Sequence, residues 1–441
     1  MPSVPETIHL IQIGEQAGAG STCSAALDDN PWLHDADHSY GPGASIDDPL
    51  PSDAPRQGVL PAEYRQASRE ELDLRIRAAK AALGERLVIL GHFYQRDEVV
   101  KYADFVGDSF QLAQATKKTP NAEAIVFCGV HFMAETADML SGPNQAVILP
   151  NLAAGCSMAD MADLDAVEDC WEELTALFAS DPGTPHLDSG DVGSQKLQPV
   201  IPVTYMNSSA ALKAFCGRHG GVVCTSSNAR SVLEWAFARG QRVLFFPDQH
   251  LGRNTAKAMG ISLDQMPLWK PEVDLGGNTE QALRDSKVIL WHGFCSVHKR
   301  FSVEQIAMAR QRHPGVRVIV HPECTLEVVE ASDENGSTDY IRKAIEAAPA
   351  GSIFAIGTEI NLVQRLANDH PDKTIFCLDS IVCPCSTMYR IHPSYLAWVL
   401  EAFERGEVLN RITVDEATTS DARIALERML ALAPGKPVSA A

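Results

Sequence analysis

Three cysteines stand at matching places in the chain. Cys156, Cys295 and Cys385 each follow the last strand-like run of a similar stretch, and 64 positions separate His92 from Cys156 as well as His321 from Cys385. Three thiolates brought together could hold zinc with a fourth ligand or water, or an iron-sulfur cluster with one iron left open. The spacing does not separate these two metals. It does exclude the compact ferredoxin and zinc-finger patterns, whose cysteines lie within a few residues of one another.

A polar triplet ends one strand in each of the three stretches. The triplets are His92-Phe93-Tyr94, Tyr205-Met206-Asn207 and His321-Pro322-Glu323. Residues two apart on a strand point to the same side, so the first and third side chains of each triplet are expected to face one site. Imidazole, phenol and carboxyl groups at such a site could transfer protons.

Hydroxyl residues form a third recurring feature. They are Ser109, Ser226, Ser337 and Thr338, each just before or at the start of an expected helix. Free backbone N–H groups and a hydroxyl at a helix start can hold a carboxylate or a phosphate, which predicts anion binding at these residues. Ordinary capping of the helix is the alternative for all four.

The elements that must position these groups repeat three times between Leu87 and Cys385 as strand, helix, turn, strand, helix and strand. This alternation predicts the α/β class, with parallel sheets in three Rossmann-like α/β/α domains. Because parallel sheets place functional groups at the carboxyl ends of their strands, the three copies could face one centre around a pseudo-threefold axis. Cysteines in or just after the apolar strands are predicted to be small buried side chains: Cys128, Cys224 and Cys377.

The domain boundaries follow from these repeats and from changes in composition. The predicted segments are an acidic, loosely ordered extension (1–60), a first domain (61–158) completed by C-terminal helices (387–441), an inserted acidic loop (159–198), a second domain (199–296) and a third domain (297–386). Pro61 to Leu83 is predicted to be one helix.

Composition excludes several classes of protein. The 441 residues carry 37 Lys and Arg against 57 Asp and Glu, a formal net charge of −20, which argues against a nucleic acid or an anionic membrane as partner. No run approaches the roughly 20 apolar residues of a membrane span. The first basic residue is Arg56, so we expect no secretory or transit peptide and a cytoplasmic location, where cysteines rarely form disulfides.

Eight strings, in order from about Ile89 to Arg390, resemble the quinolinate synthase family. They are Ala103-Asp104-Phe105-Val106-Gly107-Asp108-Ser109, Phe127-Cys128-Gly129-Val130-His131-Phe132-Met133-Ala134-Glu135-Thr136, Ala154-Gly155-Cys156-Ser157-Met158-Ala159-Asp160, Val203-Thr204-Tyr205-Met206-Asn207, Pro247-Asp248-Gln249-His250-Leu251-Gly252-Arg253, Gly293-Phe294-Cys295-Ser296-Val297-His298, His321-Pro322-Glu323 and Gly357-Thr358-Glu359. Together they are far more specific than any one of them.

The resemblance implies an activity and a cofactor. The activity is the condensation of iminoaspartate with dihydroxyacetone phosphate to quinolinate, phosphate and water, a step of de novo NAD synthesis in bacteria. The cofactor is a 4Fe-4S cluster on Cys156, Cys295 and Cys385, whose open iron serves as a Lewis acid. Some family members carry a Cys-x-x-Cys-x-x-Cys string near the third ligand, whereas this chain has Cys383-Pro384-Cys385, so Cys383 stays a second candidate.

The resemblance also implies roles for the residues at the strand ends. Glu323 resembles the family's general base, Tyr94 a proton donor, and His298 a histidine that reaches the substrate; His321 is expected to act beside Glu323. The substrate contacts are expected to be His92, Ser109, Tyr205, Asn207, Ser226, Ser337 and Thr338. A transient contact with L-aspartate oxidase, which would supply the unstable iminoaspartate, is a further expectation.

Three other functions stay open at this stage. Two of them are enzymes, another cluster-dependent hydro-lyase or a zinc lyase. The third is a non-catalytic iron-sulfur redox sensor that binds a partner through the acidic extension.

Overall fold

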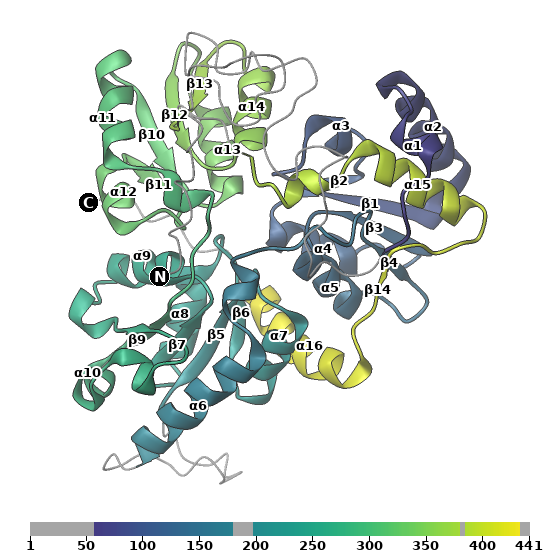
Figure 1. The fold of residues 1–441 in the computed structure, drawn as a ribbon. Helices are drawn as coiled ribbons and strands as arrows, with labels where there is room; N and C mark the ends of the chain where they lie inside the picture. Colours follow the sequence, from purple (N-terminus) through teal and green to yellow (C-terminus); the bar gives the residue numbers. More distant parts are fainter. Residues whose placement is uncertain (1–56, 180–196, 380–383, 433–441) are drawn as a thin grey trace, which may run out of the picture.

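The computed structural model describes residues 57–179, 197–379 and 384–432, which form three lobes around a common centre (Figure 1). Each lobe contains one sheet, and helices alternate with its strands. We call the lobes built on β1–β4, β5–β9 and β10–β13 the first, second and third lobe. The predicted α/β class is confirmed.

The first lobe has a five-stranded sheet in the order β14-β4-β3-β1-β2. All its pairs are parallel except that of β14 with β4. Its strands are β1 (Leu87–His92), β2 (Phe105–Gly107), β3 (Ala124–Cys128), β4 (Ala146–Ile148) and β14 (Arg411–Ile412). Its helices are α1 (Ala62–Arg65), α2 (Arg69–Leu83), α3 (Asp97–Val100), α4 (Ser109–Lys117) and α5 (His131–Leu140), and α15 (Pro393–Glu404) packs on α2.

The second lobe has a parallel sheet in the order β6-β5-β7-β9-β8. Its strands are β5 (Ile201–Tyr205), β6 (Val222–Cys224), β7 (Val243–Phe246), β8 (Leu268–Trp269) and β9 (Val288–Trp291). Its helices are α6 (Leu164–Ala179), α7 (Ala210–Arg218), α8 (Ala229–Phe237), α9 (Gln249–Ala258) and α10 (Glu280–Asp285).

The third lobe has a parallel sheet in the order β11-β10-β12-β13. Its strands are β10 (Arg317–Val320), β11 (Glu334–Asn335), β12 (Ile353–Gly357) and β13 (Thr374–Cys377). Its helices are α11 (Val303–Arg312), α12 (Leu326–Ala331), α13 (Thr338–Ala347) and α14 (Ile360–Asp369).

The three sheets share one strand order, which is what an internal repeat requires. In each lobe the first strand lies between the second and the third, and the last strand follows the third: β2-β1-β3-β4, β6-β5-β7-β9 and β11-β10-β12-β13. The sequence pattern missed β2, β6 and β11, because runs of two or three residues are too short to display a period. The pseudo-threefold axis and the domain boundaries stay predictions.

Two segments differ from expectation. The predicted helix from Pro61 to Leu83 is divided into α1 and α2, because Ser68 is extended and its hydroxyl caps α2 by accepting the Glu71 N–H. The segment 159–198 is not a loop throughout, since α6 occupies 16 of its residues. Helix α6 buries Val167, Cys170, Trp171, Leu174 and Phe178, a helical spacing that was readable in the sequence.

The C-terminal helices are divided between two lobes. Helix α15 packs on the first lobe, whereas α16 (Glu416–Ala431) packs on α7 and β6 of the second lobe. Arg428 of α16 donates to Gly221 O, while Arg423 donates to Met139 O and Ser141 O of the first lobe. Helix α16 therefore ties these two lobes together.

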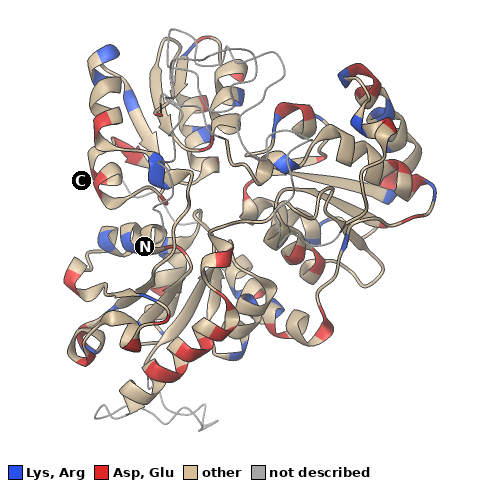
Figure 2. Ribbon diagram, viewed as in Figure 1, with Lys and Arg blue, Asp and Glu red and all other residues tan. Residues whose placement is uncertain are grey.

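Charged residues lie over the outer helices, where basic and acidic positions are interspersed (Figure 2). Helix α6 is an exception, with five acidic and no basic residues. Among the described residues, no helix combines the length and apolar character needed to cross a bilayer.

Candidate active site

A central pocket brings together side chains from all three lobes. The predicted site residues that line it are His92, Tyr94, Ser109, Cys156, Tyr205, Asn207, Ser226, Cys295, His298, His321, Glu323, Thr338 and Cys385. Ser337 lines a neighbouring cavity of about 440 Å³ instead, and Asp108 and Ser226 border both spaces. The carboxyl ends of the first strands in the three sheets therefore meet at one place, as parallel sheets allow.

The three cysteines occupy the same local structure. Each lies just before a 3₁₀ turn, and its carbonyl accepts the N–H of the residue four positions later: Asp160 to Cys156 (3.1 Å), Lys299 to Cys295 (3.0 Å) and Tyr389 to Cys385 (3.0 Å). Cys383 lies outside the described residues. Every described cysteine is a free thiol, and Cys128, Cys224 and Cys377 are buried as predicted.

Cys156, Cys295 and Cys385 influence one another's pKa values. Burial, with a smaller contribution from the neighbouring Cys385, raises the pKa of Cys156 to about 12. Burial also raises the pKa of Cys295, with added repulsion from Glu323, Cys156 and Cys385, and all three cysteines line the same pocket. Backbone N–H groups two or three residues after each cysteine donate to its sulfur and lower its pKa. The donors are Met158 and Ala159 for Cys156, His298 for Cys295, and Thr387 and Met388 for Cys385. Such donors stabilise thiolates.

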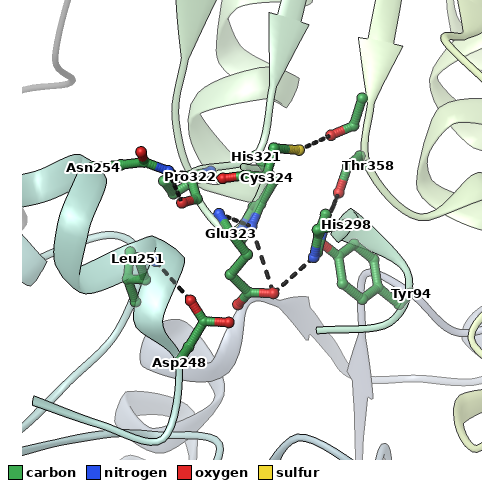
Figure 3. A network of polar contacts seen from close by, with 11 residues as sticks. Tyr94, Asp248, Leu251, Asn254, His298, His321, Pro322, Glu323, Cys324 and Thr358 are labelled. Atoms are coloured by element: carbon green, nitrogen blue, oxygen red, sulfur yellow. Dashed lines mark hydrogen bonds and ion pairs between the residues drawn. The ribbon is translucent and has the colours of Figure 1, made fainter. Parts of the chain in front are cut away.

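A chain of hydrogen bonds crosses the pocket from Glu323 to Tyr94 (Figure 3). Glu323 Oε2 lies 2.7 Å from His298 Nδ1, His298 Nε2 lies 3.1 Å from Thr358 Oγ1, and Thr358 Oγ1 lies 2.7 Å from the Tyr94 hydroxyl. Glu323 and His298 are buried. The carboxyl, the imidazole and the phenol are thus linked in a row along which a proton can be held or moved.

His92 and His321 occupy equivalent positions and are held in the same tautomer. Each ring accepts at Nδ1 the N–H of the residue two positions later, Tyr94 at 3.1 Å and Glu323 at 3.4 Å. Burial lowers the pKa of both histidines to about 3, so each ring is neutral and carries its proton on Nε2. Both rings are therefore donors to a ligand in the pocket they line. The His321 ring also stacks on His298, with the ring centroids 4.3 Å apart.

Glu323 and Asp248 are neighbouring buried carboxyl groups at one end of this row of hydrogen bonds. Burial opposes ionisation of Glu323, but the hydrogen bonds that its carboxyl accepts from His298 and Tyr205 act in the other direction and lower its pKa. Burial and the nearby charge of Glu323 raise the pKa of Asp248 well above its usual value. Asp248 Oδ1 accepts the Leu251 N–H at 2.6 Å and so caps α9, and its carboxyl lies next to Glu323 (Figure 3). The geometry favours an ionised Glu323 beside a protonated Asp248.

At the helix starts, Ser109, Ser226 and Thr338 line the central pocket, whereas another residue is the N-cap. Asp108 caps α4 and Ser337 caps α13, so Ser109 and Thr338 are the first residues of those helices. Asn228, two residues after Ser226, is the N-cap of α8. The Thr338 hydroxyl is buried and has no hydrogen-bond partner. Thr338 therefore offers an unused donor at the start of a helix, which suits an anion.

Comparison with known proteins gives a consistent result. A sequence profile described as "Quinolinate synthetase A protein" matches residues 74–431. The chain belongs to the quinolinate synthase family. It is 68% identical over 400 residues to "Quinolinate synthase" of Corynebacterium glutamicum, which covers 91% of this chain and 97% of that protein. It is 55% identical over 383 residues to "Quinolinate synthase" of a Nocardioides species, covering 85% and 93%. A solved 2-hydroxyacid dehydrogenase from a Polaromonas species matches with a TM-score of 0.15 at 13% identity, which carries no argument.

Sequence reasoning assigned no role in the site to three residues within strings that carry the resemblance to the quinolinate synthase family: Asp248, Thr358 and Glu359. Glu359 lines the pocket and accepts the Cys385 N–H at 3.3 Å, and burial raises its pKa to about 7. Asp248 and Glu359 are N-caps of the helices that follow corresponding strands, β7 and β12. A polar residue one or two positions after a strand was the available signal.

Proposed function

We propose that the chain condenses iminoaspartate with dihydroxyacetone phosphate to quinolinate, phosphate and water, with a 4Fe-4S cluster on Cys156, Cys295 and Cys385. The observation that carries the proposal is the meeting, in one pocket, of three equivalent cysteine turns and the hydrogen-bonded chain from Glu323 to Tyr94. Membership of the quinolinate synthase family supports it.

The donor set fits a cluster better than a single metal ion. The group of described residues whose ligand atoms all lie within 4.8 Å of one another is Cys295, His298 and Glu323, and it omits Cys156 and Cys385. One ion at that group would have one thiolate and would leave two equivalent cysteines unused. A cluster takes each cysteine on a separate iron, and the N–H groups aimed at the sulfurs are the donors that such clusters use. When bound, the cluster would supply a Lewis-acidic iron with an open coordination position.

Glu323 is assigned as the general base. A carboxylate with a lowered pKa is ionised at neutral pH and can accept a proton from the reacting substrates. His298 holds that carboxylate through Nδ1 and reaches Thr358 through Nε2. Burial raises the pKa of Tyr94 well above its usual value, so Tyr94 keeps its proton and can donate it.

Binding of the anionic substrates is assigned to local donors, because the chain as a whole is strongly acidic. The Nε2–H groups of His92 and His321, the Thr338 hydroxyl and the Asn207 amide all border the pocket. Ser109, Tyr205 and Ser226 complete the set of donors around it. Ser337 acts indirectly, since its hydroxyl accepts the Tyr340 N–H at 3.3 Å and so caps the helix that begins with Thr338.

The cellular setting belongs to the same proposal. Iminoaspartate is unstable in water, so a transient contact with L-aspartate oxidase would shorten its exposure. A reducing cytoplasm would protect both the cluster and the free thiols.

Anaerobic reconstitution with iron and sulfide, followed by an assay for quinolinate from the two substrates, tests the proposal. We expect turnover, four irons and four sulfides per chain, and loss of both metal and turnover in Cys156→Ala, Cys295→Ala and Cys385→Ala. Glu323→Gln should keep the cluster and lose most turnover. About one zinc per chain without sulfide, or a full cluster with no quinolinate, would refute the proposal and favour a zinc lyase or a redox sensor respectively.

A further inference from the structure

One side chain of the second lobe reaches the main chain on both sides of Glu323. Asn254 lies on α9, and its Nδ2 donates to Pro322 O at 2.9 Å and to Cys324 O at 2.8 Å (Figure 3). Asn254 is buried, with an exposed fraction of 6%. Both hydrogens of its amide are therefore used, and both go to a segment of another lobe.

The segment that Asn254 holds is otherwise fixed by its own lobe. His321 N donates to Gly357 O at 2.9 Å, and Cys324 N donates to His321 O at 3.0 Å, which closes a tight turn after β10. These bonds leave the Pro322 and Cys324 carbonyls directed at the second lobe. Two hydrogen bonds to carbonyls two residues apart restrict the rotation of the peptide units around Glu323 and so set the direction of its side chain.

Helix α9 limits the position of Glu323 in a second way. Its N-cap Asp248 places a carboxyl directly beside that of Glu323 (Figure 3). Lys257 and Glu330 also pair between α9 and α12, but both are substantially exposed and the ion pair contributes little. Tyr205 of the second lobe hydrogen-bonds the Glu323 carboxyl itself, and the Asn254 amide is the cross-lobe contact that holds the main chain on both sides of Glu323.

We propose that Asn254 is a positioning residue for Glu323, which holds the carboxylate against His298 only while the second and third lobes are in contact. The inference rests on the proposed function, in which Glu323 is the general base. It assigns to Asn254 a role in kcat, although Asn254 touches neither the reacting atoms nor the proposed cluster ligands. Misplacement of a catalytic group by about 1 Å can lower a rate by about a hundredfold.

The test compares Asn254→Asp and Asn254→Leu with a matched control. Gln145 in the first lobe is also buried, and its Nε2 also donates to two main-chain carbonyls, Thr119 O at 2.7 Å and Ala122 O at 2.9 Å. Gln145→Glu therefore removes equivalent bonds far from the pocket, and Gln145→Met also removes the acceptor of the Gly142 N–H. We expect the Asn254 variants to lower kcat about tenfold to a hundredfold with little change in KM, and the Gln145 variants to lower thermal stability while kcat stays within twofold.

Two further readouts separate positioning from general loosening. The acidic limb of the kcat profile should move to higher pH in the Asn254 variants, because Glu323 loses its contact with His298, and should not move in the Gln145 variants. In a Glu323→Gln background, Asn254→Asp should have no further effect on kcat.

Wild-type turnover with kcat unchanged in both folded Asn254 variants would overturn the inference alone. Additive losses in the double variant would do the same, since Asn254 would then act independently of Glu323. Absence of quinolinate from the reconstituted wild-type protein would overturn the proposed function and this inference together.

Discussion

The first and second lobes share one continuous apolar core, whereas the third lobe has a separate one. The shared core runs from Leu60 through both sheets to Met429, and the core of the third lobe is formed mainly by β10, β12 and the helices that cover them. The third lobe supplies Glu323, His321 and Thr338 to the central pocket. The base therefore reaches the pocket from a lobe with a core of its own.

These two regions are joined by hydrogen bonds as well as by the apolar side chains of Phe93 and Tyr389, which pack into the core of the third lobe. Arg365 of the third lobe donates to Phe93 O at 2.9 Å and pairs with Asp97 at 2.6 Å, and Asn254 donates to the main chain around Glu323. By contrast, α16 joins the first and second lobes over a packed helix face. Hydrogen bonds restrict distances and angles more tightly than apolar packing does. They therefore suit the boundary of the third lobe, where side chains of the pocket must be placed accurately.

The largest expected effect comes from a matched pair of core truncations. Phe354 on β12 and Phe245 on β7 are fully buried on corresponding strands. Each change to Ala should cost about 3–5 kcal/mol through lost burial and a cavity. Hydrogen exchange should show Phe354→Ala loosening β10 and β12 alone, and Phe245→Ala loosening the shared core. Equal loss of protection in both regions would mean that the two cores unfold as one unit.

The next largest effect is expected where α16 packs against α7. A Cβ on Gly217 would lie 1.9 Å from Asp421 O in the backbone of α16, so the two helices must separate. Gly217→Ala should destabilise the joined lobes by about 3 kcal/mol, measured by urea unfolding. Gly142→Ala is the control, since the nearest atom to its Cβ lies 3.5 Å away. A cost for Gly217→Ala no larger than for the control would show that α16 contributes little to joining the lobes.

Replacement of Arg365 should weaken the attachment of the third lobe to residues 92–97. Arg365→Met keeps the aliphatic stem but removes charge-assisted hydrogen bonds, at a cost of about 2 kcal/mol. We expect faster hydrogen exchange at residues 92–97 with the core of the third lobe unchanged. Arg365→Lys should restore only part of the protection from exchange at these residues, because an ammonium group cannot make the paired hydrogen bonds of a guanidinium group. Unchanged exchange at residues 92–97 would contradict the assignment.

Acid should weaken the joined lobes by a smaller amount. Burial lowers the pKa of His392, the N-cap of α15, to about 3. Between about pH 6.5 and pH 3 the unfolded chain binds a proton there that the folded chain does not, so stability falls as pH falls through this window. His392→Asn keeps a side chain that can accept the capping hydrogen bond but does not titrate, and should reduce the loss between pH 7 and pH 5.5 by about 1 kcal/mol. Urea midpoints with identical pH dependence in both proteins would contradict this expectation.

The longer strands and the cysteine positions were accessible from the sequence because they depend on local patterns. The apolar runs of β1, β5 and β10 and the polar residues that end them follow from strand periodicity. Helix α6 was missed although its apolar spacing was present, because acidic composition was given more weight. The roles of Ser109 and Ser337 needed the structure, since a shift of one residue decides which of two neighbours caps the helix.

The threefold internal repeat, the α/β class and the thiols, imidazoles and carboxyls that recur after the strands can all be read from the amino-acid sequence. Only the tertiary structure decided which of these groups touch. Glu323 meets His298, Asn254 bonds the main chain on both sides of Glu323, and Asp248 lies beside Glu323 across two lobes. Short-range patterns follow from backbone periodicity, but such contacts depend on how separately formed cores dock, and no local spacing records that.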